Sequence, residues 1–395
     1  MDKVAYVVIR EDIESPIIES QVLDVLSYIS NKRSSKPTLI WFYRIDYFLR
    51  SFSRPGALKK RLGERGIKIV LIPFIAGKFP VSWFWMALVL PQWLIGLSWV
   101  WLRYGNNIFH CRSYHAAFAG ILFKKLFNVK IVFDPRSPFV EENVAAGKWR
   151  QDGVSFRLWK IVERWVAKNS DAIIAISGPF TRHFREISPD TRVLFIPNSY
   201  SENPSVNYGL EQGKKKMLCY VGSLGQWNDP NVYLDFLRAL NDRQASFSAV
   251  KFVIPSSSVA LLEQSLRTKN LILPEFIITS VDRNDVLKEI SCCTVGLQLM
   301  KRPDERLGIK FVEYLGAGVP VIASHNVKGA AEIIRDYGVG IVLEEDCKNL
   351  DEVIAFINKV AEERSYWRNK CRKVARNLFS LDIIATQITQ LYDSL

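Results

Sequence analysis

Two glutamates separated by seven residues, Glu305 and Glu313, stand out in the C-terminal half of the chain. Between them, Gly308 and the apolar spacing that follows it predict a short helix, which ends at Gly318 and leads into a buried strand. The start of a helix presents free N–H groups and a partial positive charge, which suit an anion such as a diphosphate. Lys310 adds a full charge there. The second glutamate can accept hydrogen bonds from a pair of adjacent hydroxyls, as on a ribose.

The same two carboxylates fit other roles. Both can be solvated surface glutamates, because charged side chains are mostly exposed. A glycosidase would instead need two carboxyls facing each other about 5 to 10 Å apart, and nothing in the sequence argues for that geometry. The complete string of helix start, lysine, glutamate, turn and strand favours the anion site over both alternatives.

Length and composition limit the possible classes of protein. A chain of 395 residues with 48% hydrophobic residues is too long for one ordinary core and fits two domains. Its six cysteines lack Cys-x2-Cys spacing, so they indicate neither a disulfide framework nor a zinc site. We therefore expect a reducing cytoplasm. The N-terminal residues lack the basic region and cleavage site of a signal peptide, and we expect none.

Positive charge is concentrated in the first half of the chain. Residues 1–205 hold 29 Lys and Arg against 17 Asp and Glu, whereas residues 206–395 hold 24 against 23. No aromatic and basic motif of a known nucleic-acid-binding module is present, so we expect no nucleic-acid partner. Attraction to anionic lipid head groups fits the charge equally well.

A Trp-rich segment, residues 79–102, carries no formal charge and holds five of the 11 tryptophans. It is long enough to span a bilayer. Spanning would, however, split a single sheet, and Pro80, Pro91 and Gly96 interrupt the segment. A helix packed on the sheet and an element lying in the membrane interface are the other two possibilities. Peripheral membrane binding is the working hypothesis.

Alternating strands and helices predict parallel sheets in both halves of the chain. In the first half we expect strands at residues 3–9, 39–43 and 68–73, and strands within 108–115, 130–137, 171–178 and 193–199. Ligands bind outside the carboxyl ends of such strands. The polar residues expected there are His110, Arg112, His115, Asp134 and Arg136. Asp134 and Arg136 can also simply pair with each other.

The second half opens with a strand that leads into a glycine-containing loop, residues 217–225. Gly222 and Ser223 in this loop can approach phosphates through their backbone N–H groups. Residues 201–216 are expected to be a linker. Further strands are expected at 250–254, 276–280, 293–299, 319–323 and 338–342, and helices over 350–395.

These motifs resemble the GT-B glycosyltransferases, particularly the retaining family 4 members that build bacterial surface polysaccharides. The resemblance rests on the Glu-x7-Glu string, on the His-x-Arg-Ser and Asp-x-Arg segments at 110–113 and 134–136, and on Ile-Pro-Asn at 196–198. It implies two Rossmann-like, doubly wound α/β domains with an interdomain cleft. Residues 1–205 would bind the acceptor and residues 206–378 the nucleotide sugar. A helix within 379–395 would cross back to the first domain.

The resemblance also implies the reaction and its residues. A hexose would pass from a UDP- or GDP-linked donor to a lipid-linked or saccharide acceptor, with retention and without a metal or other cofactor. The enzyme would be peripheral on the cytoplasmic face of the plasma membrane. Implied catalytic residues are Glu305, Asp134 and Arg136, implied donor-binding residues are Gly222, Ser223, Arg302, Gly308, Lys310 and Glu313, and acceptor-side candidates are Arg112 and His115.

The sequence departs from that family in two places. Its first loop, residues 11–16, has Glu-Asp-Ile-Glu-Ser-Pro where the family usually has a Gly-Gly pair. An Arg and a Lys that neutralise the leaving diphosphate are missing after Gly222. Among Lys301, Arg302, Arg306 and Lys310, we assign their role to Arg302 and Lys310. The missing pair motivates one alternative, a non-catalytic subunit that binds nucleotide sugars, and a GT-B sugar-nucleotide epimerase is the other.

Overall fold

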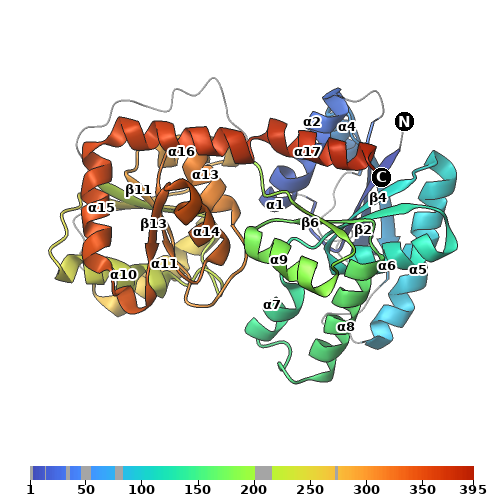
Figure 1. Ribbon diagram of the computed structural model, residues 1–395, viewed down its shortest axis with the longest axis horizontal. Helices are drawn as coiled ribbons and strands as arrows, with labels where there is room; N and C mark the ends of the chain where they lie inside the picture. Colours follow the sequence, from blue (N-terminus) through green and yellow to red (C-terminus); the bar gives the residue numbers. More distant parts are fainter. Residues whose placement is uncertain are drawn as a thin grey trace. The chain divides into compact units, whose positions relative to one another are not determined.

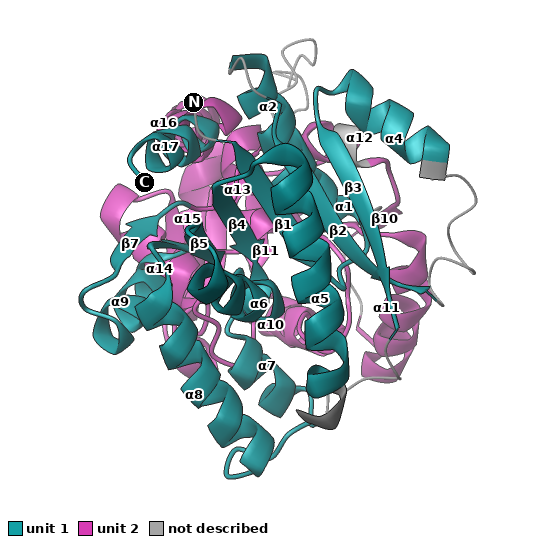
Figure 2. Ribbon diagram, turned by 90° about the vertical axis from the view of Figure 1, so that its right-hand side faces the viewer, with its two compact units in different colours: residues 1–196, 384–395 teal, residues 197–383 magenta. Residues whose placement is uncertain are grey.

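The computed structural model describes residues 3–13, 15–32, 36–45, 55–75, 83–200, 216–271 and 275–395. The chain divides into two compact units (Figure 1 and Figure 2). Unit 1 consists of residues 1–196 and 384–395, and unit 2 consists of residues 197–383. Apart from Lys216, the predicted linker lies outside the described residues.

Unit 1 is built on a parallel sheet of seven strands in the order β3-β2-β1-β4-β5-β6-β7. The strands are β1 (Val4–Ile9), β2 (Thr38–Arg44), β3 (Lys68–Phe74), β4 (Ile108–Arg112), β5 (Lys130–Asp134), β6 (Ala172–Ala175) and β7 (Arg192–Phe195). The chain proceeds outward from β1 to β3 and resumes at β4 on the other side of β1. The topological switch point, where ligands of such sheets bind, therefore lies between β1 and β4.

Helices cover both faces of this sheet. As a result, every residue of β1 is buried, whichever face its side chain points to. Tyr6 and Val8 belong to a core shared with α2 and α4, while Ala5, Val7 and Ile9 belong to a core shared with α5, α6 and α8. The helical elements of unit 1 are α1 (Pro16–Ile18), a π-helical turn η1 (Glu19–Leu23), α2 (Asp24–Lys32), α4 (Pro55–Glu64), α5 (Trp83–Tyr104), α6 (Ser113–Leu126), α7 (Phe139–Ala145), α8 (Val154–Asn169), α9 (Gly178–Ile187) and most of α17 (Leu381–Asp393).

Unit 2 repeats the plan with six parallel strands in the order β10-β9-β8-β11-β12-β13. They are β8 (Met217–Val221), β9 (Ala249–Val253), β10 (Phe276–Thr279), β11 (Val295–Gln298), β12 (Val321–Ser324) and β13 (Gly340–Leu343). The helices are α10 (Pro230–Asp242), α11 (Ser256–Lys269), α12 (Arg283–Ser291), α13 (Ile309–Ala317), α14 (Lys328–Tyr337), a 3-10 turn η2 (Glu345–Cys347), α15 (Leu350–Glu362) and α16 (Arg364–Phe379). The switch point of this sheet lies between β8 and β11.

The Trp-rich segment forms α5, which lies beside α6 on one face of the sheet in unit 1 (Figure 2). Trp93, Leu97 and Val100 are fully buried, and a Cβ on Gly96 would come within 2.7 Å of the Phe42 ring. In the part of the chain that the structure describes, Met86–Tyr104 is the one helical stretch long and apolar enough to cross a bilayer, and one third of it is buried. Helix-on-sheet packing, one of the three predicted alternatives, is what the structure shows for the inward face.

Candidate active site

In unit 2, Gly222 begins the loop that leaves the carboxyl end of β8. Its φ is +113°, a backbone conformation that glycine adopts readily and other residues rarely do. A Cβ on Gly222 would lie 3.7 Å from Cε of Lys310. Two residues that the sequence predicts for one site are therefore adjacent in space. Ser223 is exposed in the same loop.

Helix α13 begins and ends where the two glycines predict. Gly308 precedes it with a φ of +82°, and Gly318 follows it with a φ of +81°. A Cβ on Gly308 would lie 2.7 Å from Nε2 of Gln298, and that amide nitrogen donates a hydrogen bond to the Leu307 carbonyl at 2.9 Å. The first turn of α13, with its free N–H groups, is thus fixed beside the carboxyl end of β11.

Lys310 lies in this first turn and points to the Gly222 loop. Its Nζ donates to Oδ1 of Asn228 at 2.7 Å and to the hydroxyl of Tyr220 at 3.2 Å, and it lies 4.5 Å from the centroid of the Tyr220 ring. Burial lowers the pKa of Lys310 to about 7, although the carboxylates of Glu313 and Asp304 act in the opposite direction. Because a bound anion would favour the charged ammonium, this lysine is suited to receive a diphosphate.

The loop between β11 and α13 carries two more of the predicted cations. Arg306 forms a bidentate ion pair with Asp304, in which Nε–Oδ1 and Nη2–Oδ2 are both 2.9 Å. Its guanidinium lies 5.6 Å from the ring centroid of Trp227. Arg302 is exposed in the same loop. Lys310 and Arg306 therefore both lie against the Gly222 loop, Lys310 through Asn228 and Arg306 through Trp227.

The two glutamates differ in their surroundings. Glu305 precedes α13, is 34% exposed at its side chain, and has Oε1 3.7 Å from Nζ of Lys328. Glu313 lies on α13 and is partly buried. The next residue, Tyr314, is fully buried, and its hydroxyl accepts a hydrogen bond from the Val221 N–H at 2.9 Å. That hydroxyl also lies 3.2 Å from carbonyl oxygens on β8 and β11, so it joins the two strands at the switch point.

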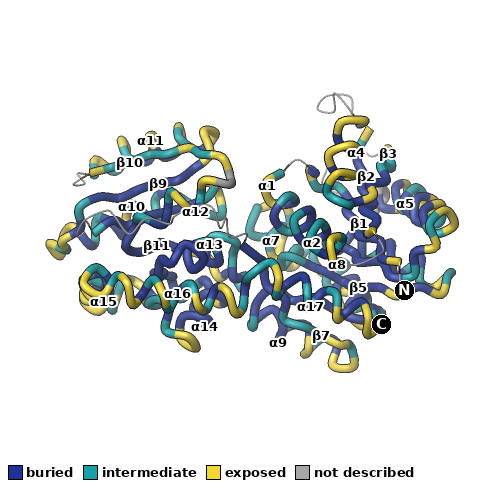
Figure 3. Tube along the Cα trace, turned by 90° about the horizontal axis from the view of Figure 1, so that it is seen from above, coloured by how far each residue is buried: buried dark blue, intermediate teal, exposed yellow. Residues whose placement is uncertain are grey.

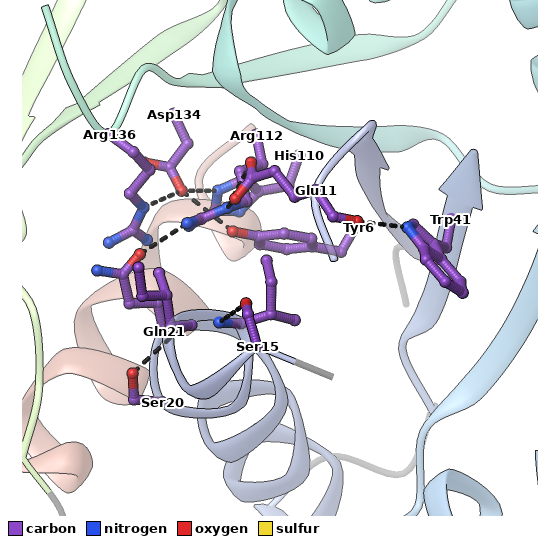
Figure 4. A network of polar contacts seen from close by, with 12 residues as sticks. Tyr6, Glu11, Ser15, Ser20, Gln21, Trp41, His110, Arg112, Asp134 and Arg136 are labelled. Carbon is purple, nitrogen blue, oxygen red and sulfur yellow. Dashed lines mark hydrogen bonds and ion pairs between the residues drawn. The ribbon is translucent and has the colours of Figure 1, made fainter. Parts of the chain in front are cut away.

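A second polar group surrounds Asp134 in unit 1 (Figure 4). Its Oδ2 accepts hydrogen bonds from the Tyr6 hydroxyl at 3.1 Å, from Nε2 of His110 at 3.1 Å and from Nε of Arg136 at 2.7 Å. Burial alone would raise the pKa of Asp134, but Arg136 and His110 outweigh it and hold that pKa below its usual range. The predicted pairing of Asp134 with Arg136 is therefore present, within a larger network.

The imidazole in this network has a defined tautomer. Burial lowers the pKa of His110, so the ring is neutral near pH 7. With Nε2–H donating to Asp134, Nδ1 must accept, and its partner is the Tyr392 hydroxyl at 2.6 Å. Tyr392 lies on α17, so the last helix of the chain completes a network formed by β1, β4 and β5.

Arg112 occupies the end of β4 and is 2% exposed. Its Nε lies 2.9 Å from both carboxylate oxygens of Glu11, and its Nη2 donates to Oε1 of Gln21 at 2.7 Å. Among the described residues, Nη1 of Arg112 and Oδ1 of Asp134 are buried without a hydrogen-bond partner. Buried polar atoms are nearly always satisfied, so a polar ligand or water is expected at both atoms.

Backbone strain is concentrated at the same edge of the sheet. Arg10, Ser113 and Arg136 follow β1, β4 and β5 with φ values of +69°, +69° and +59°. Such conformations cost non-glycine residues roughly 1 to 3 kcal/mol and are concentrated at functional sites. They support the assignment of this edge as a ligand-binding region.

Two family models match the chain, one in each half. The model of glycosyl transferases group 1 matches residues 206–378, and the model of the glycosyl transferase 4-like domain matches residues 44–199. The chain belongs to the GT-B glycosyltransferases. No curated protein sequence matches it.

Solved structures similar to this glycosyltransferase include sucrose-phosphate synthase from Thermosynechococcus elongatus, with 17% identity and a TM-score of 0.73 over 100% of this chain and 99% of that one. HepE of Anabaena, solved with UDP, has 14% identity and a TM-score of 0.69 over 100% of both chains. The lipopolysaccharide outer core galactosyltransferase WaaB has 14% identity and a TM-score of 0.65 over 100% of both chains. The predicted fold of two Rossmann-like α/β domains is confirmed.

His115 does not lie in the Asp134 network of this glycosyltransferase. It is buried on α6 among Trp93, Phe139 and Trp159, with ring centroids 6.2, 5.2 and 5.0 Å away. Burial, and then the charge of Arg10, lower the pKa of His115 to about 3. Its imidazole is therefore neutral throughout the physiological range.

Several residues of the glycosyltransferase site were missed from the sequence. They are Tyr6, Glu11 and Tyr392 around the unit 1 network, and Tyr220 and Asn228 beside Lys310. For Glu11, the one available signal was its place in the loop of residues 11–16, where the family resemblance implies a Gly-Gly pair. The other four carried no local signal.

Proposed function

We propose that this glycosyltransferase moves a hexose from a nucleoside-diphosphate donor to an acceptor hydroxyl, with retention of the anomeric configuration and without a metal. The observation that carries the proposal is the position of Lys310, in the first turn of α13 and against the Gly222 loop. An ammonium and free helix N–H groups together can stabilise a departing diphosphate. Arg302 in the neighbouring loop adds positive charge.

The remaining donor contacts follow from the same placement. Backbone N–H groups of Gly222, Ser223 and Gly308 would contact the diphosphate, and Glu313 would accept hydrogen bonds from the ribose hydroxyls. Glu305 would lie beside the transferred sugar. In the reaction, the bond from C1 to the diphosphate oxygen breaks and a bond from C1 to the acceptor oxygen forms on the same face. The acceptor proton passes to the departing diphosphate.

A UDP-linked hexose is the first donor to test, followed by a GDP-linked one. HepE was solved with UDP and with UDP-glucose, and WaaB is a galactosyltransferase. These relatives support the class of donor, and they leave the identity of the sugar to experiment.

The acceptor would bind at the carboxyl edge of the sheet in unit 1. Nη1 of Arg112 and Oδ1 of Asp134 are buried without a hydrogen-bond partner among the described residues, and we propose that acceptor hydroxyls bind beside them, while Arg136 holds the aspartate in place. We propose a lipid-linked saccharide as acceptor and a peripheral location on the cytoplasmic face of a bacterial plasma membrane, in surface polysaccharide biosynthesis. The positive excess of residues 1–205 supports this location.

The test compares wild type with Glu313→Ala in thermal-shift and donor-hydrolysis assays against UDP-, GDP-, ADP- and CMP-sugars. Glu263→Ala is the matched control, because Glu263 is exposed on α11 of the same unit. One nucleotide sugar should raise the melting temperature of wild type and of the control, since binding stabilises the native state by mass action. The same ligand should leave Glu313→Ala unchanged.

Other outcomes separate the alternatives. Binding without hydrolysis or transfer, over a panel of acceptors, would favour a non-catalytic subunit. Appearance of an epimerised donor would favour a sugar-nucleotide epimerase. The absence of a thermal shift with every nucleotide sugar would refute the assignment of the donor site.

A further inference from the structure

The outward face of α5 is apolar along its described side chains. Its exposed residues between 86 and 102 are Ala87, Leu88, Pro91, Ile95, Trp99 and Leu102, which we call the α5 stripe. Ile95, Trp99 and Leu102 are 70%, 52% and 75% exposed and share one helix face by their spacing. Figure 3 shows exposed stretches along this helix. A solvated helix face normally carries polar and charged residues, so the α5 stripe indicates a contact surface.

A cavity of about 670 Å³ lies where α5 ends, at the amino ends of β1, β2 and β3. Five of the residues that line it are cationic: Lys3, Lys36, Lys59, Lys68 and Arg103. None of the described lining residues is an aspartate or glutamate. We call it the basic cavity.

Tyr104 is one of the residues that line the basic cavity, and it also contacts the α5 stripe. Its ring makes an edge-to-face contact with Trp99, with centroids 6.2 Å apart. Nζ of Lys68 lies 3.7 Å from the Tyr104 ring centroid, and the Arg103 guanidinium lies 5.4 Å from it. The apolar stripe and the cluster of positive charges are therefore one continuous surface within unit 1.

The basic cavity has the properties of an anion site. Burial lowers the pKa of Lys68, and repulsion by the charges of Arg103 and Lys3 lowers it further. Asn106, which also lines the cavity, is 2% exposed, and its Oδ1 has no hydrogen-bond partner among the described residues. A phosphate would neutralise the cations, and a hydroxyl beside it would satisfy the amide oxygen.

Neither candidate group of the active site uses this cavity. Arg112 and Asp134 lie at the carboxyl ends of β4 and β5, whereas the cavity lies at the amino ends of the strands. The C-terminal carbonyls of α5 carry only a partial negative charge, so the end of this helix alone does not account for a cluster of five cations.

We propose that the basic cavity binds the phosphate of an anionic membrane lipid head group while the α5 stripe enters the adjoining bilayer interface. Trp and Tyr favour the membrane interface, and an apolar helix face beside basic residues is the usual composition of a peripheral membrane anchor. The proposal deepens the peripheral location given above and does not depend on the transfer reaction.

The experiment is co-sedimentation of the full-length protein with vesicles of phosphatidylcholine alone or of phosphatidylcholine and phosphatidylglycerol in a ratio of about 70:30. The test variant is Lys36→Ala/Lys59→Ala, and its control is Lys168→Ala/Arg185→Ala, which removes the same charge from exposed positions on α8 and α9. Each basic residue at an anionic surface contributes about fivefold in affinity, so the test variant should bind about 25-fold more weakly. The control should stay within about fivefold of wild type.

The stripe is tested separately with brominated lipids, which quench nearby tryptophans. Trp99→Phe should lose a measurable part of the quenching, and Trp99→Ser should weaken binding. Tyr366→Ser, at a similarly exposed aromatic residue of unit 2, should leave binding unchanged. Equal melting temperatures for all variants would show that each is folded.

Three results would overturn the proposal. The first is no preference of wild type for the anionic vesicles. The second is an equal loss of binding in the test and control double variants. The third is binding of inorganic phosphate in the cavity, abolished by Lys36→Ala/Lys59→Ala, without any vesicle binding, which would identify a soluble phosphate as the ligand.

Discussion

Donor affinity should depend on pH through Lys310. The pKa of this lysine is lowered from its ordinary value of 10.5 to about 7 by burial, so the ammonium is largely lost above pH 7 in the free protein. A bound diphosphate favours the charged form and raises that pKa again. The affinity for the donor should therefore be highest below pH 7, where Lys310 is already charged, and should fall as the pH rises from 7 toward 10.

The size of the effect follows from the two pKa values. At pH 9, which is two units above the pKa of Lys310 in the free protein, only about 1% of this lysine is charged. Protonating it on binding costs about 1.4 kcal/mol for each pH unit above that pKa. This sets an upper limit of about a hundredfold loss in affinity between pH 6 and pH 9. Since the side chain is partly exposed and solvent screens its charge, we expect the loss of affinity to be at least about tenfold.

Isothermal titration with UDP-glucose between about pH 6 and pH 9 measures this effect. UDP-glucose is preferred to UDP because it lacks a phosphate monoester that titrates near pH 6. Pairs of buffers with different ionisation enthalpies should show uptake of close to one proton per donor at pH 8. Lys310→Met should bind weakly and without this dependence, and Lys288→Met, at an exposed lysine of α12, should behave as wild type. Constant wild-type affinity across the range, or the same slope in Lys310→Met, would refute the reasoning.

Two further substitutions test the geometry around each candidate group. Gly308→Ala should lower the free energy of unfolding by roughly 1 to 3 kcal/mol and weaken donor binding, because φ is +82° and the added Cβ would meet an amide at 2.7 Å. Gly225→Ala, with open space around it, should leave both the melting temperature and the donor Kd unchanged. Tyr392→Phe leaves a buried ring nitrogen unpaired, so it should cost roughly 1 to 3 kcal/mol of stability and lower kcat at an unchanged donor KM. An unaltered kcat would contradict a positioning role for this hydroxyl.

What the sequence predicted correctly depended on local signals. The helix between Gly308 and Gly318 was predicted because glycines mark its ends and apolar residues recur at helical spacing. Lys310 and Gly222 were assigned to one site by the family resemblance, and their proximity agrees with a general rule, since loops at the carboxyl ends of neighbouring parallel strands meet at one edge.

The missed contacts join residues that are far apart in the chain. Tyr6 and Asp134 are 128 positions apart, and His110 and Tyr392 are 282 apart. Asn228, the partner of Lys310, is 82 positions away. No periodicity or spacing relates such residues, because their meeting depends on the order of strands in the sheet and on the return of the last helix to unit 1.

Charge is distributed unevenly within unit 1. One edge of its sheet carries a charge-balanced network and the other a cluster of cations, and the residue counts of the first half do not distinguish the two. In the network at the carboxyl edge, the charges of Arg112 and Arg136 are matched by Glu11 and Asp134, and His110 is neutral. This group can position hydroxyls by hydrogen bonds, but it offers little net charge to attract a phosphate. The basic cavity at the amino edge holds five cations and no described carboxylate. We therefore assign part of the positive excess of the first half to the proposed lipid contact, whereas Glu11, in the loop of residues 11–16, balances the charge of Arg112 at the carboxyl edge.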